Sequence, residues 1–307
     1  MAVMNTIEQR KIEHFRLASG LEIPIIGIGT WKVGGRLEPD TSHDKEFLAA
    51  LKAGITAGLT HIDTAELYGN GHAEELVGQA MRSVKGIRRA DLFITSKVMS
   101  QHLKHDAVIA ACKQTLERLQ TDYLDLYLVH HPNPSIAITE TMRAMEYLVE
   151  SNLVRFIGVS NFSVSQLQEA QKYCKHKIVA NQIEYSLVAR DAGMFTKNME
   201  SEIIPYCQEH GILVISWRTL AYGLLAKSGQ FPVLDEIAKK YNKTPAQIAL
   251  NWCLSKNIAV IPKMSSLAHI QEDLGALGWK ISEEDSNTLE LGFIKYKNKY
   301  PKELVGV

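Results

Sequence analysis

The stretch HDKEFLAALKAGITAGLTHIDTAELYG, residues 43–69, begins with a helical pattern and ends with a predicted strand and its turn. Its second half contains a short apolar run, LTHID, that ends on the carboxylate of Asp63. An unpaired carboxylate at a buried strand end is energetically expensive, so we expect a partner for Asp63 elsewhere in the chain. The apolar residues of the first half recur at helical spacing: Phe47, Leu48, Leu51 and Ile55.

Short apolar runs like LTHID recur along the chain and alternate with amphipathic stretches. They lack strict alternation of apolar and polar residues, which is typical of parallel strands covered on both faces. The eight runs are IIGIG (25–29), LTHID (59–63), DLFITSK (91–97), LDLYLVH (124–130), RFIGVS (155–160), IVANQ (178–182), ILVISW (212–217) and IAVIPK (258–263).

Helical patterns lie between these runs, and two of them carry start signals. Ser163 is followed three residues later by Gln166, and Thr244 precedes Pro245 at the first helical position. Eight strand-then-helix units predict a single (β/α)₈ TIM barrel in the α/β class, forming one domain over residues 1–307. The segment HFRLASGLEIPII predicts an N-terminal β-hairpin that turns at Ser19-Gly20 and plugs the lower end of the barrel.

The composition excludes several classes of protein. The 34 basic and 34 acidic side chains balance, which argues against nucleic-acid and membrane-surface partners. No apolar run approaches the roughly 20 residues that span a bilayer, and the polar N-terminus resembles no signal peptide. Four widely spaced cysteines favour a reducing, cytoplasmic location. No heptad or apolar repeat specifies an oligomeric state, and a monomer is our working expectation.

Polar or aromatic residues follow every apolar run, where barrel enzymes carry their active sites. Because eight separate strand ends change character in the same way, we interpret them as one site. In chain order the residues are Thr30 and Trp31, Asp63 and then Tyr68, Lys97, His130, Ser160 and Asn161, Gln182, Trp217, and Lys263.

These residue types predict a site that polarises and protonates a carbonyl. Asp63 and Lys97 end neighbouring runs and are expected to pair. A lysine beside Tyr68 is expected to lower the phenol pKa, which makes a tyrosine a competent general acid. His130 could donate a hydrogen bond to the same substrate oxygen, while the adjacent His131 is expected to point to the opposite side of the strand.

The ordered motifs HIDTAELYG, ITSKV, YLVHHP, RFIGVSNFS, NQIEYS and IPKMSS resemble the aldo-keto reductase family, from about Phe15 to about Glu290. This resemblance implies a barrel that binds NADP(H) and reduces a small-molecule carbonyl substrate. It implies Tyr68 as general acid, Lys97 and Asp63 as the pair that tunes it, and His130 as the residue that orients the carbonyl. Trp31 is implied as a wall of the substrate pocket.

The same resemblance implies a cofactor site without a Rossmann fingerprint, since Lys32 replaces the third glycine of GIGTWK. Trp217 would stack on the nicotinamide ring, and Lys263 and Ser265 would hold the 2′-phosphate beside a helix start. No metal is expected. The full cofactor set is Gly29, Thr30, Asp63, Ser160, Asn161, Gln182, Trp217, Arg218, Leu220, Lys263, Ser265, Glu272 and Asp273.

Three positions depart from the family pattern. His269 stands where members that prefer NADP often carry arginine, and Asp273 where they often carry asparagine. A neutral histidine is a weaker phosphate partner than a guanidinium, so use of NAD(H) is left open. Arg218 replaces the usual serine, and the sequence leaves open whether it contacts the pyrophosphate or the solvent.

Other functions remain in competition at this point. The barrel could bind the cofactor as a regulatory subunit with little catalysis, or Lys97 could form a Schiff base in an aldolase. A metal-dependent hydrolase is disfavoured because the first run has no H-x-H pattern. The substrate, which could be an aldehyde, ketone, sugar or diketo acid, depends on mouth loops and on the tail LGFIKYKNKYPKELVGV, which sequence patterns do not specify.

Overall fold

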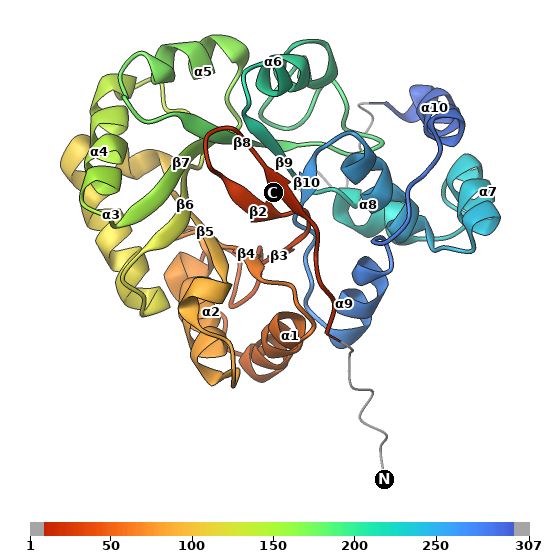
Figure 1. The fold of residues 1–307 in the computed structure, drawn as a ribbon, viewed down its shortest axis with the longest axis horizontal. Coiled ribbons are helices and arrows are strands. Elements are labelled where there is room, and N and C mark those ends of the chain that lie inside the picture. Colours follow the sequence, from red (N-terminus) through yellow and green to blue (C-terminus); the bar gives the residue numbers. More distant parts are fainter. Residues whose placement is uncertain (1–8, 298–307) are drawn as a thin grey trace.

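Eight parallel strands form one sheet with the order β10-β9-β8-β7-β6-β5-β4-β3 in the computed structural model, which describes residues 9–297. Each predicted apolar run overlaps one strand, so the predicted barrel is confirmed (Figure 1). The strands are β3 (Gly27–Gly29), β4 (His61–Asp63), β5 (Phe93–Val98), β6 (Leu124–Val129), β7 (Val154–Ser160), β8 (Ile178–Glu184), β9 (Leu213–Trp217) and β10 (Ala259–Val260).

The barrel closes between its first and last strands through single bridges. Ile26 pairs with Val260, and Gly29 pairs with Lys263. The Gly29 N–H donates to the carbonyl of Pro262 at 2.9 Å. A Cβ on Gly29 would lie 2.4 Å from the carbonyl oxygen of Ile261, so only glycine lets the two backbones approach this closely.

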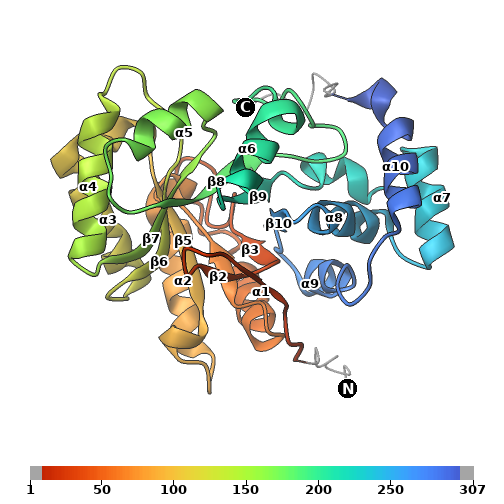
Figure 2. The same ribbon diagram turned by 45° about the horizontal axis from the view of Figure 1, so that its top comes forward.

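Helices surround the sheet (Figure 2). Both predicted start signals are confirmed, because Ser163 and Thr244 accept from the backbone N–H of Gln166 and Gln247 in reciprocal capping boxes. The helices are α1 (Asp44–Thr56), α2 (His72–Ser83), α3 (His105–Leu119), α4 (Ile138–Glu150), α5 (Val164–Gln171), α6 (Ile204–Glu209), α7 (Pro232–Tyr241), α8 (Pro245–Ser255), α9 (Leu267–Leu274) and α10 (Glu283–Gly292). No helix within residues 9–297 is both long and apolar enough to cross a membrane.

The predicted hairpin is also confirmed. Strands β1 (His14–Arg16) and β2 (Glu22–Pro24) pair antiparallel, and Gly20 has a φ of 86° in the turn between them. Leu21 and Ile23 are buried against the apolar residues inside the barrel. Figure 1 shows the hairpin lying across the middle of the ring of strands, so it closes that end of the barrel.

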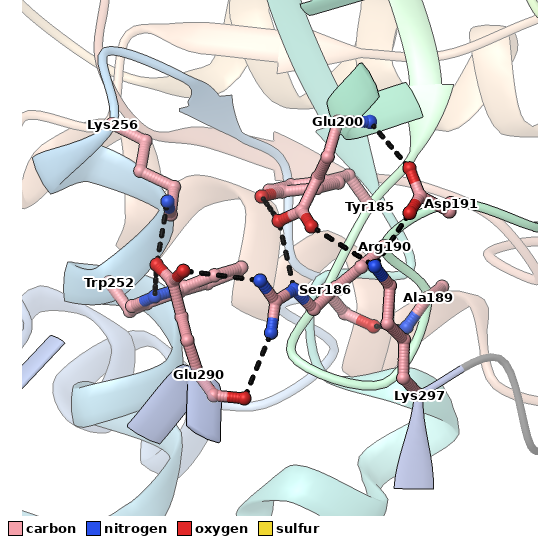
Figure 3. A network of polar contacts seen from close by, with 10 residues as sticks. All are labelled: Tyr185, Ser186, Ala189, Arg190, Asp191, Glu200, Trp252, Lys256, Glu290 and Lys297. Atoms are coloured by element: carbon pink, nitrogen blue, oxygen red, sulfur yellow. Dashed lines mark hydrogen bonds and ion pairs between the residues drawn. The ribbon is translucent and has the colours of Figure 1, made fainter. Parts of the chain in front are cut away.

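One buried arginine joins the loop after β8 to α10 (Figure 3). The Arg190 guanidinium pairs with Glu200 at 2.8 Å and with Glu290 of α10 at 3.1 Å. Lys297 pairs with Asp191 at 2.6 Å. These contacts hold the loop against α10, while the rest of the C-terminal tail, residues 298–307, lies outside the described part of the chain.

Candidate active site

Lys97 connects the groups at the centre of the rim. Its side chain is fully buried, and Nζ donates to Asp63 Oδ1 at 2.5 Å, to the carbonyl of Thr64 at 2.8 Å and to Tyr68 Oη at 3.1 Å. These bonds use all three donors of the ammonium group. Asp63 accepts a further bond from Gln182 Nε2 at 2.7 Å. The partner expected for the Asp63 carboxylate is therefore Lys97, as predicted.

Local backbone geometry brings these side chains together. Asp63 ends β4, and Lys97 lies near the end of the neighbouring strand β5. Tyr68 begins the 3₁₀ turn Tyr68–Gly71, in which Gly69 has a φ of 56°. A Cβ on Gly69 would lie 2.3 Å from the carbonyl oxygen of Gly34, so a glycine is required for the turn that points Tyr68 inward.

The expected lowering of the Tyr68 pKa is wrong. Burial raises the pKa of Tyr68 above its usual value, and the opposing charge of Lys97 does not overcome it. Burial alone would lower the pKa of Lys97, but the charges of Asp63 and Tyr68 raise it. The phenol is therefore protonated at neutral pH, which is the form that a general acid needs. Lys97 is likewise protonated, which argues against a Schiff-base mechanism.

The two adjacent histidines do not point to opposite sides, so that expectation is also wrong. Their rings stack with centroids 4.8 Å apart at 10°. The alternation of strand side chains does not apply, because both residues follow the last residue of β6, Val129. Burial lowers the pKa of His130 well below its usual value, with Lys97 and His131 adding to the effect. His130 is therefore neutral, and its ring lies 5.7 Å from that of Tyr68.

Asn161 joins two sides of the rim. It follows the end of β7 with a φ of 63°, a left-handed conformation that asparagine tolerates. Its Nδ2 lies within hydrogen-bond distance of the carbonyl of His130 at 3.1 Å, of Ser160 Oγ at 2.9 Å and of His131 Nδ1 at 3.0 Å, and its two hydrogens are shared among these three acceptors. Its Oδ1 accepts from Trp217 Nε1 at 3.1 Å. Ser160, Asn161 and Trp217, which the sequence analysis assigned to the cofactor site, thus form one connected group at the ends of β7 and β9.

Trp31 and Thr30 lie on the opposite side of the same rim. The ring of Trp31 meets that of Tyr68 edge to face at 5.0 Å, which suits a wall beside the phenol. Thr30 Oγ1 donates to the carbonyl of Asp63 at 2.9 Å, and Gly29 takes part in barrel closure. Thr30 and Gly29 therefore support the backbone of the site.

Arg218, which the sequence left undecided, faces the site. Its guanidinium lies 4.6 Å from the ring of Trp217 and 4.2 Å from that of Tyr222, and it pairs with Glu184 at 3.4 Å. The Glu184 side chain is 1% exposed, so this carboxylate needs the cation. Leu220 follows in the same loop and is half-buried.

The residues expected to bind the 2′-phosphate lie at the seam of the barrel, where β3 and β10 meet. Lys263 is exposed and bridges to Gly29, and Ser265 and Ser266 precede α9. The pKa of Lys263 is lowered by desolvation of its ammonium group and, to a smaller extent, by the charge of Lys32. Within residues 9–297, neither lysine forms an ion pair. Two neighbouring cations without a partner anion fit a phosphate group.

The side chain of Asp273 carries little negative charge at neutral pH. It is buried on α9, and burial together with the neighbouring Glu272 raises its pKa to about 8. The carboxyl group is therefore mostly neutral at pH 7. His269 is exposed on the same helix, 3.5 Å from Ser265 Oγ.

The sequence reasoning missed two residues of the site, Glu184 and Phe195, and misplaced a third, His131. Glu184 stands in NQIEYS but carries no periodic signal that separates it from a core residue. Phe195 lies in the loop after β8 and contacts the ring of His131 at 4.3 Å and that of Trp217 at 6.0 Å. His131 was considered but placed on the wrong side. No group of three potential metal ligands occurs in the described part of the chain.

Comparison with known proteins places this arrangement in context. The family model described as "Aldo/keto reductase family" matches residues 25–291. The chain is 35% identical to the methylglyoxal reductase YeaE of Escherichia coli, covering 97% of this chain and all of that protein. It is 35% identical to the glyoxal reductase of Bacillus subtilis, covering 90% of this chain and 91% of that protein.

Solved structures agree with the fold. A thermostable aldo-keto reductase in complex with the inhibitor epalrestat has a TM-score of 0.84 at 41% identity, covering 91% of this chain and 99% of that chain. An aldo/keto reductase from Klebsiella pneumoniae in complex with NADP and acetate has a TM-score of 0.81 at 34% identity, covering 92% and 96%.

Proposed function

This chain belongs to the aldo/keto reductase family, and on that premise we propose that it reduces a small aldehyde or ketone to an alcohol with NADPH, with Tyr68 as the proton donor. The observation that carries the proposal is the chain of contacts from Asp63 through Lys97 to Tyr68 Oη. The alternative of a regulatory barrel does not require a complete proton-donating group.

The chain's own residues supply the proton and the stabilising charges. NADPH, when bound, supplies the hydride. Tyr68 keeps its proton at neutral pH because burial raises its pKa, and it gives that proton to the oxygen of the carbonyl. The Lys97 ammonium then stabilises the phenolate that remains. His130 is neutral, so it can orient the oxygen by a hydrogen bond without adding a charge.

The cofactor would extend from Trp217 toward the start of α9. Trp217 offers the aromatic face for the nicotinamide, and Arg218 and Leu220 follow it in the loop that leads to the diphosphate. Lys263 and Lys32 offer cations for the 2′-phosphate, assisted by Ser265, while Glu272 and Asp273 lie near the adenine end. A neutral Asp273 does not repel the phosphate, which supports NADPH over NADH, with NADH as a weaker substitute.

The relatives suggest the first substrates to test. The matching E. coli and B. subtilis proteins are named methylglyoxal reductase and glyoxal reductase, so small reactive aldehydes are the substrate class that we propose. We also place the protein in the cytoplasm, since its four cysteines are buried and unpaired, as expected in a reducing compartment. A monomer remains our prediction for the oligomeric state.

Replacement of the proton donor tests the proposal. Tyr68→Phe removes the hydroxyl and keeps the ring, so we expect a loss of reductase kcat of about 10²-fold or more with little change in NADPH affinity. Steady-state assays with methylglyoxal measure kcat, and a fluorescence titration measures the affinity for NADPH. Persistent turnover in this variant would show that the proton comes from another group.

A further inference from the structure

His131 lies at the mouth of the site and has no role in the reaction described above. Its ring stacks on that of His130, the residue that orients the carbonyl oxygen. It also contacts Phe195, whose side chain is largely exposed. A polar ring in this position can contact a part of the substrate that the proton transfer does not involve.

The hydrogen bonds around Asn161 determine which nitrogen of His131 carries the proton. The indole N–H of Trp217 can only donate, so the amide oxygen of Asn161 must face it. The amide nitrogen of Asn161 therefore faces His131 Nδ1, at 3.0 Å. An amide nitrogen does not accept, so a proton on Nδ1 would point at another donor, and Nδ1 must therefore offer its lone pair.

The proton of His131 consequently lies on Nε2. Burial, reinforced by the charge of Lys97, lowers the pKa of His131 to about 4, so the ring is neutral and holds one proton. The fully buried side-chain nitrogens and oxygens without a hydrogen-bond partner do not include His131 Nε2. It also forms no hydrogen bond with another residue between 9 and 297, so this N–H is accessible to a ligand.

We propose that the Nε2–H of His131 is a specificity-determining donor for substrates that carry a second oxygen on the carbon next to the reacting carbonyl, as vicinal dicarbonyls do. The two stacked rings lie 4.8 Å apart. Hydrogen bonds of about 2.9 Å from each ring can converge on oxygens of neighbouring carbons. This inference rests on the proposed function, because His130 must hold the first oxygen.

A matched pair of variants separates the two nitrogens of the ring. Asparagine places an acceptor near the position of Nδ1, which keeps the bond from Asn161 but removes the outer donor. Glutamine places an amide N–H near the position of Nε2. The probes are diacetyl, a vicinal dicarbonyl, and butanone, its single-carbonyl analogue, each assayed with NADPH.

We expect His131→Asn to lower kcat/KM for diacetyl by about tenfold, the effect of one hydrogen bond, and for butanone by less than about threefold. His131→Gln should retain most of the diacetyl preference. Equal losses on both ketones, or equal behaviour of the two variants, would overturn the inference. If the unmodified protein reduces neither ketone nor methylglyoxal, the proposed function itself fails. NADPH titration of each variant checks that the cofactor site is intact.

Discussion

At the scale of single residues, the site depends on one buried ammonium group. Lys97 donates to Asp63, to the backbone at Thr64 and to Tyr68. A buried cation with three satisfied donors has little freedom to move, so it defines where the phenol oxygen lies. The tyrosine hydroxyl is thus positioned by the lysine as well as stabilised by it.

Removal of the counter-charge should impair both stability and catalysis. Asp63→Asn leaves Lys97 buried without an anion, so we expect the free energy of unfolding to fall by about 3–5 kcal/mol and kcat to fall by at least about tenfold. Urea unfolding and the pH–rate profile measure these effects.

Asp125→Asn is the control for this prediction. Asp125 is also a buried carboxylate, paired with Arg89 and Arg155. Its loss should lower stability but leave the kcat of the folded enzyme unchanged. An Asp63→Asn variant with an unchanged pH–rate profile would contradict the proposed coupling to Tyr68.

The chemical types and order of the central residues could be predicted from the sequence, because polar groups at strand ends stand out against apolar runs. The direction of the Tyr68 pKa shift could not, since it depends on how completely the phenol is buried. The stacking of His130 on His131 was missed for a related reason: strand alternation gives no information about residues beyond the strand end.

At the scale of elements, helix α9 begins beside the seam of the barrel and carries the buried carboxyl group of Asp273 in its last turn. Ser266 caps the helix by accepting from the N–H of His269 at 3.3 Å. The position of the helix could be predicted from the serines before it, whereas the burial of Asp273 depends on packing against the rest of the molecule.

The buried acid predicts how stability varies with pH. The folded state holds the Asp273 proton up to about pH 8, whereas the unfolded chain releases it near the usual value of 3.8. The folded state therefore binds more protons between these values, so stability decreases as the pH rises through this range. Asp273→Asn removes this loss, and its Tm should exceed that of the parent by about 2 °C or more at pH 8.5.

The difference between the two proteins should shrink toward pH 5, as measured by thermal unfolding without cofactor. Glu283→Gln, at an exposed site in the first turn of α10, is the control and should leave the slope of Tm against pH unchanged. A constant offset between Asp273→Asn and the parent across the pH range would contradict the assignment.

At the scale of the whole molecule, the barrel is weakest where its ends meet. Strands β5 to β8 are six or seven residues long, whereas β3 has three residues and β10 has two. Closure relies on isolated bridges and on the missing side chain of Gly29. The eightfold alternation of the sequence predicted that the sheet closes, but not how few hydrogen bonds close it.

A methyl group at the seam should therefore cost more than a methyl group nearby. Gly29→Ala would meet the backbone of Ile261, which cannot move aside without opening the barrel, so we expect a loss of about 1–3 kcal/mol. In Gly54→Ala the nearest atom is the tip of the Ile28 side chain, which can rotate. Alanine also favours the helical backbone of α1, by about 0.5–1 kcal/mol.

Urea unfolding of both variants gives the comparison. A Gly54→Ala variant that is as unstable as Gly29→Ala would show that the seam has no special sensitivity. Because Gly29 and Lys263 bridge the same seam, a destabilised Gly29→Ala protein should also bind NADPH more weakly.

The hairpin of β1 and β2 also bears on the order in which ligands bind and leave. Leu21 and Ile23 close one end of the barrel. Cofactor and substrate must therefore bind and leave at the other end. If the cofactor and the carbonyl compound share this opening, we expect the cofactor to bind before the carbonyl compound and to leave after the alcohol. Release of the oxidised cofactor would then be the step that we expect to limit turnover.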